Sequence, residues 1–394
     1  MKNYLLTLVF TGCSLAISPH AIAQVVGTSP DGSATISPAK NGEVTIKVNN
    51  DRSLINLTGF SLKAGERVVI NQPSPKSVLF LRMEVQTPIE IHGHIKANGR
   101  IFLINPEGIT LGPQSNIAAA GVFVTTADMK ESDFQVDEIR FEDDLETWGQ
   151  INTQGLIRSS AGGFVSIIGD YINTNGTIEA GDGSKLTMMT AAAFNYSLIE
   201  KGVIPSSIRP VSKKAKLLDR FMGIPVIQNL AKLNAEGGQI EIGIYVDYSV
   251  GGKAALIWGN IKGAFSMIAK VIGQVELTRV KVDAGSAPIS IDIQDDLLFT
   301  GANELKAGTI NVKAGDELNS FGGGVVMDTS STSGNGGNIR IEGKKLSFAG
   351  ILKANGAVNG GNITVTSPGR VDVSKLKTEA TGKSGKPGVI TLPK

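Results

Sequence analysis

The sequence predicts an all-β protein whose short strands are wound into a parallel β-helix. Two blocks recur at the spacing of one coil: INTQGLI at residues 151–157 returns as INTNGTI at 172–178, and NGGNIRI at 335–341 returns as NGGNITV at 359–365. Glycine accounts for 48 of the 394 residues, whereas aromatic residues make up only 5%. These observations indicate short strands closed by tight turns and repeated along the chain.

The length of the repeat selects the architecture. A propeller blade needs about 40 to 45 residues, whereas a unit of about 22 residues holds three short strands and their turns. About 13 to 15 coils, stacked at about 4.8 Å, would form the rod. We expect inward-facing Val, Ile, Leu and Ala to stack from coil to coil, with Gly and Asn at the turns. A narrow interior of this kind accounts for the low aromatic content.

Residues 1–23 have the pattern of a secretory signal peptide. A positively charged start precedes an apolar stretch at residues 4–10 and a small-residue motif ending at Ala23, so we expect cleavage between Ala23 and Gln24. An alternative interpretation is a lipoprotein site at which Cys13 is acylated. With cleavage after Ala23 the only cysteine leaves with the signal peptide, so the exported chain contains no disulfide.

Charge and hydropathy exclude two kinds of interaction. The 38 basic and 36 acidic residues give a net charge of only +2, which is too small to attract nucleic acid over the whole surface, so we expect no nucleic-acid partner. No stretch after the signal peptide reaches the roughly 18 apolar residues of a membrane-spanning helix. We therefore expect no transmembrane helix.

Two segments interrupt the repeats and divide the chain. Residues 128–147 are acidic and predict an exposed excursion with one helical turn. Residues 196–234 predict a partly helical insertion, because proline-marked loops surround apolar residues at helical spacing, namely Leu217, Leu218, Phe221 and Met222. A first domain at residues 24–195 and a glycine-rich continuation of the β-helix at 235–394 complete the expected organisation.

Three blocks, at residues 59–83, 91–112 and 161–183, resemble the N-terminal secretion domain of the filamentous-haemagglutinin type. This domain belongs to the exported partner in two-partner secretion, and the resemblance covers residues 24–193. The matching positions occur in the family's order: Phe60, Gly65, Gln72-Pro73, Ser77-Val78, Gly93, Ala97-Asn98-Gly99, Phe102-Leu103-Ile104-Asn105-Pro106, Gly108-Ile109 and Gly112.

The resemblance implies a right-handed parallel β-helix with an N-terminal cap and loop insertions. It implies one specific partner, an outer-membrane β-barrel transporter with periplasmic recognition domains. The product would cross the periplasm and the outer membrane to be secreted or displayed at the cell surface. The implied secretion motif consists of Asn105, Pro106, Glu107, Gly108 and Ile109.

The sequence departs from the family pattern in places. Glu107 replaces the second Asn of the usual Asn-Pro-Asn-Gly-Ile turn, while the proline and the glycine that shape the turn are kept. Residues 81–83 read Leu-Arg-Met instead of Asn-Arg-Val, a second Asn-Pro-Asn-Leu motif is missing, and the chain is shorter than typical members. The changes of motif bear on transporter recognition rather than on the fold.

No motif predicts a catalytic, cofactor-binding or metal site. His92 and His94 share a strand face, but no nearby cysteine or carboxylate cluster completes a metal site. The pairs Asp143-Asp144 and Asp295-Asp296 are candidates for acid–base or calcium-assisted chemistry on a sugar chain, with a solvated loop and a coil corner as the alternative interpretations. The basic run at residues 213–216 is either a grip for an acidic ligand or a solvated helix face.

Three hypotheses about function follow. The first is a non-enzymatic exported protein that acts in adhesion or matrix formation, with a host-surface or extracellular polysaccharide ligand. The second is a β-helical protein that binds or cleaves polysaccharide. The third is a surface protein that binds a host iron carrier through the loops at residues 196–234.

Overall fold

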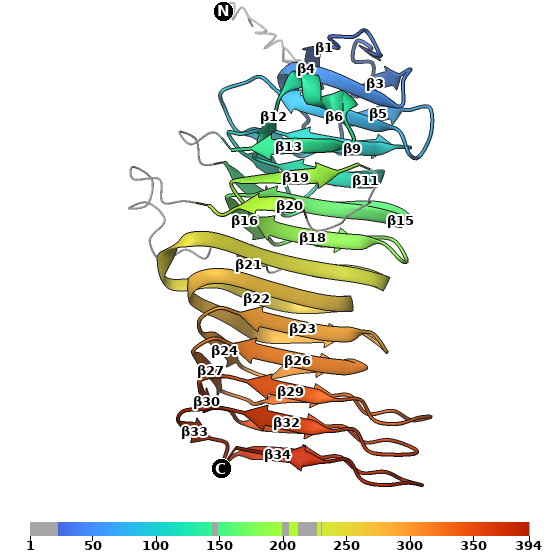
Figure 1. Cartoon of the computed structure of the whole chain (residues 1–394). Helices are drawn as coiled ribbons and strands as arrows, with labels where there is room; N and C mark the ends of the chain where they lie inside the picture. Colours follow the sequence, from blue (N-terminus) through green and yellow to red (C-terminus); the bar gives the residue numbers. More distant parts are fainter. Residues whose placement is uncertain (1–22, 144–148, 199–204, 212–226, 230, 394) are drawn as a thin grey trace, which may run out of the picture.

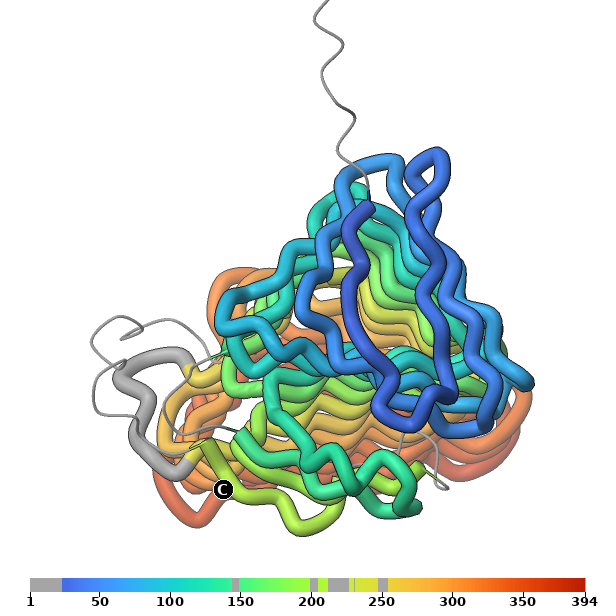
Figure 2. The backbone as a smooth tube through the Cα atoms, turned by 90° about the horizontal axis from the view of Figure 1, so that it is seen from above, coloured from blue at the N-terminus to red at the C-terminus, as the bar shows by residue number. Residues whose placement is uncertain are grey.

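The structure is a parallel β-solenoid of about 13 turns, which confirms the predicted fold class. The computed structural model describes residues 23–143, 149–198, 205–211, 227–229 and 231–393, with the side chains of 247–253 left out. Successive coils follow one another along a single axis (Figure 1), and they superimpose on a roughly triangular outline when viewed along it (Figure 2).

Each coil contributes a strand to each of three parallel faces. The first face contains β3 (Glu43–Val48), β5 (Arg67–Asn71), β8 (His94–Ala97), β17 (Thr177–Glu179), β25 (Asn303–Lys306), β28 (Val325–Asp328), β31 (Gly350–Lys353) and β34 (Leu376–Glu379). The second contains β4 (Arg52–Ser61), β6 (Val78–Met83), β9 (Arg100–Ile104), β18 (Lys185–Thr190), β23 (Pro288–Ile293), β26 (Thr309–Ala314), β29 (Ile339–Glu342), β32 (Ile363–Thr366) and β35 (Ile390–Thr391). The third contains β7 (Ile89–Ile91), β10 (Ile109–Leu111), β14 (Gln150–Thr153), β16 (Tyr171–Thr174), β21 (Ile227–Asn229), β24 (Leu297–Thr300), β27 (Glu317–Phe321), β30 (Lys345–Ser347) and β33 (Val371–Asp372).

Three long strands bend from one face into the next. β11 (Asn116–Thr125) and β15 (Leu156–Gly169) each begin on the first face and end on the second. β22 (Lys232–Asp283) continues through several corners, pairing with β18, β21 and β24 along its length. These strands connect the N-terminal coils to the glycine-rich C-terminal coils without an interruption of the stack.

In-register rows of aliphatic side chains fill the interior, as the sequence predicts. On the second face, Ile101, Val122, Val165, Leu186 and Ile240 occupy equivalent positions in successive coils. All of them are buried. Because neighbouring strands lie about 4.8 Å apart, each side chain packs directly on its counterparts above and below.

Both sequence repeats lie in adjacent coils. Ile151 pairs with Ile172 across β14 and β16. Ile339 pairs with Ile363 across β29 and β32. The repeats therefore record the period of the β-helix in this chain.

An antiparallel cap covers the N-terminal end of the stack. β1 (Gln24–Thr28) pairs antiparallel with β4, and β2 (Ala34–Ile36) pairs antiparallel with β3. The cap thereby gives hydrogen-bond partners to edge strands that would otherwise be open to pairing with another chain.

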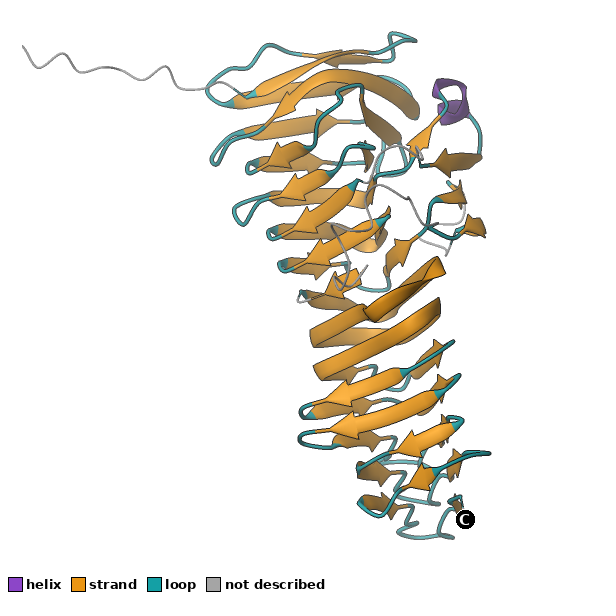
Figure 3. Cartoon of the chain, turned by 90° about the vertical axis from the view of Figure 1, so that its left-hand side faces the viewer, coloured by secondary structure: helices purple, strands orange, loops and turns teal. Residues whose placement is uncertain are grey.

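A separate four-stranded antiparallel sheet lies against the outside of the upper coils (Figure 3). We call it the outer sheet, and it consists of β12 (Asp128–Met129), β13 (Glu138–Glu142), β19 (Ala193–Ser197) and β20 (Ser206–Arg209). A 3₁₀ helix, η1 (Glu131–Gln135), joins its first two strands. The outer sheet thus joins two excursions that lie far apart in the sequence.

The structure corrects the expectation of an exposed excursion at 128–147, and it describes only part of the insertion expected at 196–234. The acidic excursion at 128–147 has the expected helical turn, but it is not simply exposed, since Phe134, Ile139 and Phe141 are buried. The described parts of 196–234 contain only strands, an isolated bridge and connecting residues. The apolar residues at 217–222, for which a helix is predicted, lie outside the described residues, as does the basic run at 213–216.

Candidate functional site

The predicted secretion motif forms the corner between β9 and β10. Asn105 is fully buried, and its Nδ2 donates hydrogen bonds to the carbonyl oxygens of Gly108 at 2.8 Å and Thr87 at 3.2 Å. The amide of Gly108 donates to the carbonyl of Asn105 at 3.1 Å, which closes the turn. The Asn105 side chain therefore joins the turn to the loop that precedes β7 in the previous coil.

Gly108 and Pro106 fix the turn against the next coil. Gly108 has φ +122°, and a Cβ atom there would lie 2.9 Å from the carbonyl oxygen of Gln150. The carbonyl oxygen of Pro106 approaches Gly149 so closely that any side chain at 149 would clash with it. Glu107 is only partly buried, and its amide lies 3.4 Å from Asn105 Oδ1. The motif consequently acts as a structural corner in which Glu107 is the least constrained position.

A second group of family positions forms another corner, centred on buried Gln72. Its Nε2 donates to the carbonyls of Ser77 and Arg100, and its Oε1 accepts from the amide of Gly99 at 3.1 Å. Asn98 exchanges two hydrogen bonds with the backbone of Gln72, at 2.7 and 2.8 Å. These polar positions, which are separated in the sequence, meet in one network that satisfies the buried backbone of the corner.

Between these two corners runs the second face, and aromatic side chains cover its outer side. Phe80, Phe102 and Phe123 are in register on β6, β9 and β11 and are fully buried beneath the outer sheet. The ring centroids of Phe102 and Phe123 lie 4.7 Å apart. Phe141 and Phe194 of the outer sheet stack on each other at 5.2 Å, and Phe141 lies 5.2 Å from Phe123. We call this group the aromatic ladder.

The aromatic ladder was not anticipated, but a signal for it exists in the sequence. Each of Phe80, Phe102 and Phe123 is flanked on both sides by an aliphatic residue. An uninterrupted apolar run in a strand indicates burial on both faces, whereas a strand with one solvated face alternates. The few aromatic residues are therefore concentrated in one place. Among the described residues, most of the buried phenylalanines lie outside the coil interior, in or beneath the outer sheet.

Polar contacts fasten the rim of the outer sheet. Arg82 donates to both carboxylate oxygens of Asp128, at 2.7 and 2.6 Å, and this hydrogen bonding raises the pKa of Arg82. Asn56 donates to Glu131 at 2.8 Å. Arg52 pairs with Asp137. The departure at residues 81–83 thus retains the arginine that fixes the first strand of the outer sheet.

Arg100 lies at the opposite border of the ladder and is 8% exposed. Its Nη1 donates to the carbonyl oxygen of Leu198 at 3.1 Å, at the end of the outer sheet. Burial lowers the pKa of Arg100. The guanidinium therefore connects β9 to the chain that follows β19.

The histidines and the first carboxylate pair are not brought together into a site. His92 is partly buried and lies 3.3 Å from Glu90, whereas His94 is exposed on the first face. Asp143 is 4% exposed and its amide donates to the carbonyl of Ala192, which corrects the expectation of a solvated loop at this residue. Asp144 lies outside the described residues. Among the described residues, these groups do not form a cluster of three potential metal ligands.

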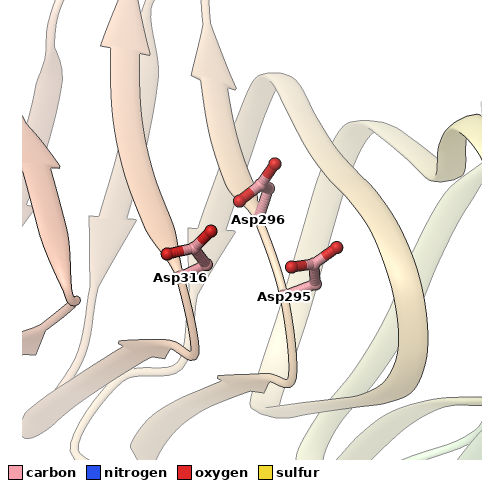
Figure 4. Close-up of side chains that lie close together, drawn as sticks. All are labelled: Asp295, Asp296 and Asp316. Carbon is pink, nitrogen blue, oxygen red and sulfur yellow. The ribbon is translucent and has the colours of Figure 1, made fainter.

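Asp295 and Asp296 lie at a coil corner, as one interpretation of the sequence holds, and Asp316 of the next coil joins them (Figure 4). Their carboxylates also accept backbone hydrogen bonds, Asp295 from Gly273 at 2.8 Å and Asp296 from Glu317 at 3.0 Å. Burial raises the pKa of Asp296, and the neighbouring carboxylates raise it further. The ligand atoms of the three carboxylates lie within 4.8 Å of one another, so these residues could hold a cation, and two of them also hydrogen-bond to the backbone of the adjacent coils.

Comparison with known proteins agrees with this architecture. Residues 23–276, about two thirds of the chain, match the family described as TPS secretion domain. The chain belongs to the TPS secretion domain family. The match contains the cap, the predicted secretion motif and the whole outer sheet, and it continues beyond the boundary expected at residue 195.

Two proteins of Haemophilus influenzae are similar to part of this TPS chain. A protein named "Heme/hemopexin-binding protein" from Haemophilus influenzae is 26% identical over 203 residues, which cover 49% of this chain and 22% of that protein. A second H. influenzae protein of the same name is 29% identical over 99 residues, covering 25% of this chain and 11% of the relative. The chain thus matches less than a quarter of the length of either relative.

A solved structure has the same fold. The crystal structure of the HMW1 secretion domain from Haemophilus influenzae matches with a TM-score of 0.64 and 18% identity, covering 93% of this TPS chain and 98% of that domain. In the described residues, no helix is sufficiently long and apolar to span a membrane. The predicted cleavage between Ala23 and Gln24 stays a prediction, because residues 1–22 lie outside the description and β1 begins at Gln24.

Replacing Asn105 by Ala should destabilise the folded protein by about 1–3 kcal/mol, because the carbonyls of Thr87 and Gly108 lose a buried donor. Glu107→Ala is the matched control at the same turn and should change stability by less than about 0.5 kcal/mol. Denaturant unfolding of refolded protein measures both. A secretion defect in an Asn105→Ala variant of normal stability would instead assign the residue to transporter recognition.

Replacing Arg82 by Gln should loosen the outer sheet while leaving the coils intact, because Asp128 loses its bidentate partner. Hydrogen exchange should become at least about tenfold faster in β12 and β13, with no change in β14 or β16. Arg340→Gln, at an exposed ion pair with Glu342, is the control. Unchanged exchange rates of β12 and β13 in the Arg82→Gln variant would contradict the prediction and would show that the aromatic ladder and the remaining polar contacts hold the sheet without Arg82.

Proposed function

We propose that this chain is exported across the outer membrane by a cognate β-barrel transporter with periplasmic recognition domains, and that it acts in attachment at the cell surface. The observation that carries the proposal is the family match over residues 23–276. The transporter, the surface location and the non-enzymatic role are all parts of the proposal.

The physical organisation of the chain supports export in an unfolded form. Its only cysteine is Cys13, in the predicted signal peptide, so the remaining residues contain no disulfide-closed loop that would obstruct a barrel. Each coil hydrogen-bonds to its neighbours in the stack, and the cap pairs with the first strands. Folding can therefore start at the capped end and proceed coil by coil on the outside of the cell.

The names of two relatives favour a second candidate function, the binding of a host iron carrier. The hypothesis that such a ligand is held by residues 196–234 has limited structural support, because Tyr196 is 2% exposed and packs into the aromatic ladder. A carrier would have to contact other surfaces of the chain or residues outside the described part.

Deletion of the transporter gene should leave the protein in the periplasm, because a soluble β-helix has no route of its own through the outer membrane. Cell fractionation and immunoblotting of culture medium, outer membrane and periplasm measure this distribution. The same cells complemented with the transporter gene are the control. Undiminished release from the deletion strain would contradict the proposal.

The two candidate activities make opposite predictions for the released protein. If it acts in attachment, cells lacking its gene should adhere several-fold less to host cells or to surfaces, and purified protein should not retain hemopexin. Binding of purified protein to hemopexin with a Kd in the micromolar range or below, with unchanged adhesion of the mutant cells, would favour the iron-carrier function. Surface plasmon resonance and a quantitative adhesion assay measure the two quantities.

A further inference from the structure

Two rows of outward-facing side chains run along the first face of the C-terminal coils, and each row takes one residue from each of β25, β28, β31 and β34. The first row is Lys306, Asp328, Lys353 and Glu379. The second row is Glu304, Val326, Ile351 and Lys377. These strands lie beyond residue 276, where the match to the secretion domain ends. The two rows therefore belong to the glycine-rich continuation of the β-helix.

The lysines of these rows lack the ion pairs that three basic residues form on the other two faces of the C-terminal coils. Those ion pairs are Lys313 with Asp292, Arg340 with Glu342 and Lys345 with Glu317. Among the described residues, Lys306, Lys353 and Lys377 form no ion pair within the chain. Lys306 and Lys353 both have Asp328 beside them in register, but its carboxylate accepts a hydrogen bond from the amide of Ser330 instead. The ammonium groups are therefore available to solvent or to a partner.

Each row is its own charge complement when its order is reversed. The two-fold axis that uses this property lies along the strands, between β28 and β31, and it relates two copies face to face with their rods antiparallel. The contacts across such an axis are Asp328 with Lys353, Lys306 with Glu379, Glu304 with Lys377 and Val326 with Ile351, each made twice. Every charged side chain of the two rows then meets an opposite charge, and the apolar pair lies beside the axis.

We propose that this face of the C-terminal coils binds a second copy of the chain in the antiparallel arrangement. Moving the two-fold axis onto β28 or β31 would place lysine against lysine, which is unfavourable. A parallel arrangement would place Val326 and Ile351 against charged side chains. Both residues are only half-buried in the single chain, so the antiparallel contact removes apolar surface from water. Charge and apolar surface therefore favour the same register.

The size of the contact predicts a weak and reversible dimer. Four strands span only about 19 Å along the axis, whereas a stable complex buries about 800 Å² on each partner. Antiparallel rods are the arrangement expected when chains on two facing cells meet, and this consequence rests on the surface role proposed above. Many weak contacts between two surfaces add up to a strong one. The attachment proposed above would then join cells that carry the same protein.

Sedimentation equilibrium of the purified full chain at low salt should show a monomer–dimer equilibrium that high salt weakens, because salt screens exposed charges. Lys353→Glu and Asp328→Lys should each weaken dimerisation by at least about tenfold, since each places like charges at two symmetric contacts. An equimolar mixture of the two variants should regain the dimer, because both contacts then join opposite charges. Lys313→Glu makes the same change of charge on the second face, and this matched control should alter the Kd by less than about twofold.

Several results would overturn the proposal. These are a monomer at every concentration up to about 1 mM, undiminished dimerisation of either single variant, and failure of the mixture to regain the dimer. Sensitivity to Lys353→Glu alone would identify a different acidic surface as the partner and would reject the antiparallel register. Because dimerisation is measured on purified protein, transporter-dependent release can be intact while the dimer is absent, in which case only the interface is rejected.

Discussion

The in-register stacking of one coil on the next is the constraint on which this structure depends. Every inward position must accept the same kind of side chain in successive coils, as Ile101, Val122 and Val165 do. Each corner must also leave room for the backbone of its neighbour, which is why Gly108 and Gly149 lie where the turns meet. The same register that builds the core therefore determines which residues the corners and the outer faces can carry.

The outer sheet is the principal departure from this regular plan, and it follows from one face being apolar on both sides. Phe80, Phe102 and Phe123 point away from the coil interior, so the second face needs a cover. The outer sheet supplies the cover, and Arg82 and Arg100 join its borders to the coils. Two excursions that interrupt the repeats thus become one packed layer.

Much of the fold could be predicted because its signals are local. The repeats at 151–157 and 172–178 lie in adjacent coils, and Asn105 to Ile109 form the expected turn. The outer sheet was missed because β13 and β19 pair across some fifty residues of sequence, and no local pattern specifies that pairing. The burial of Asp143 was missed for the same reason, since its backbone partner is Ala192.

The separation of the two halves of the outer sheet has a consequence for the order of assembly. β12 and β13 can form a hairpin as soon as residue 142 is available, but β19 and β20 come only after two further coils have been added. Until then only two of the four strands cover the phenylalanines. The apolar surface that is still exposed can associate with other apolar surfaces. A chain that emerges gradually from its N-terminal end would therefore pass through an intermediate. In this intermediate several coils are already stacked, but the phenylalanines of the second face are still partly exposed to solvent.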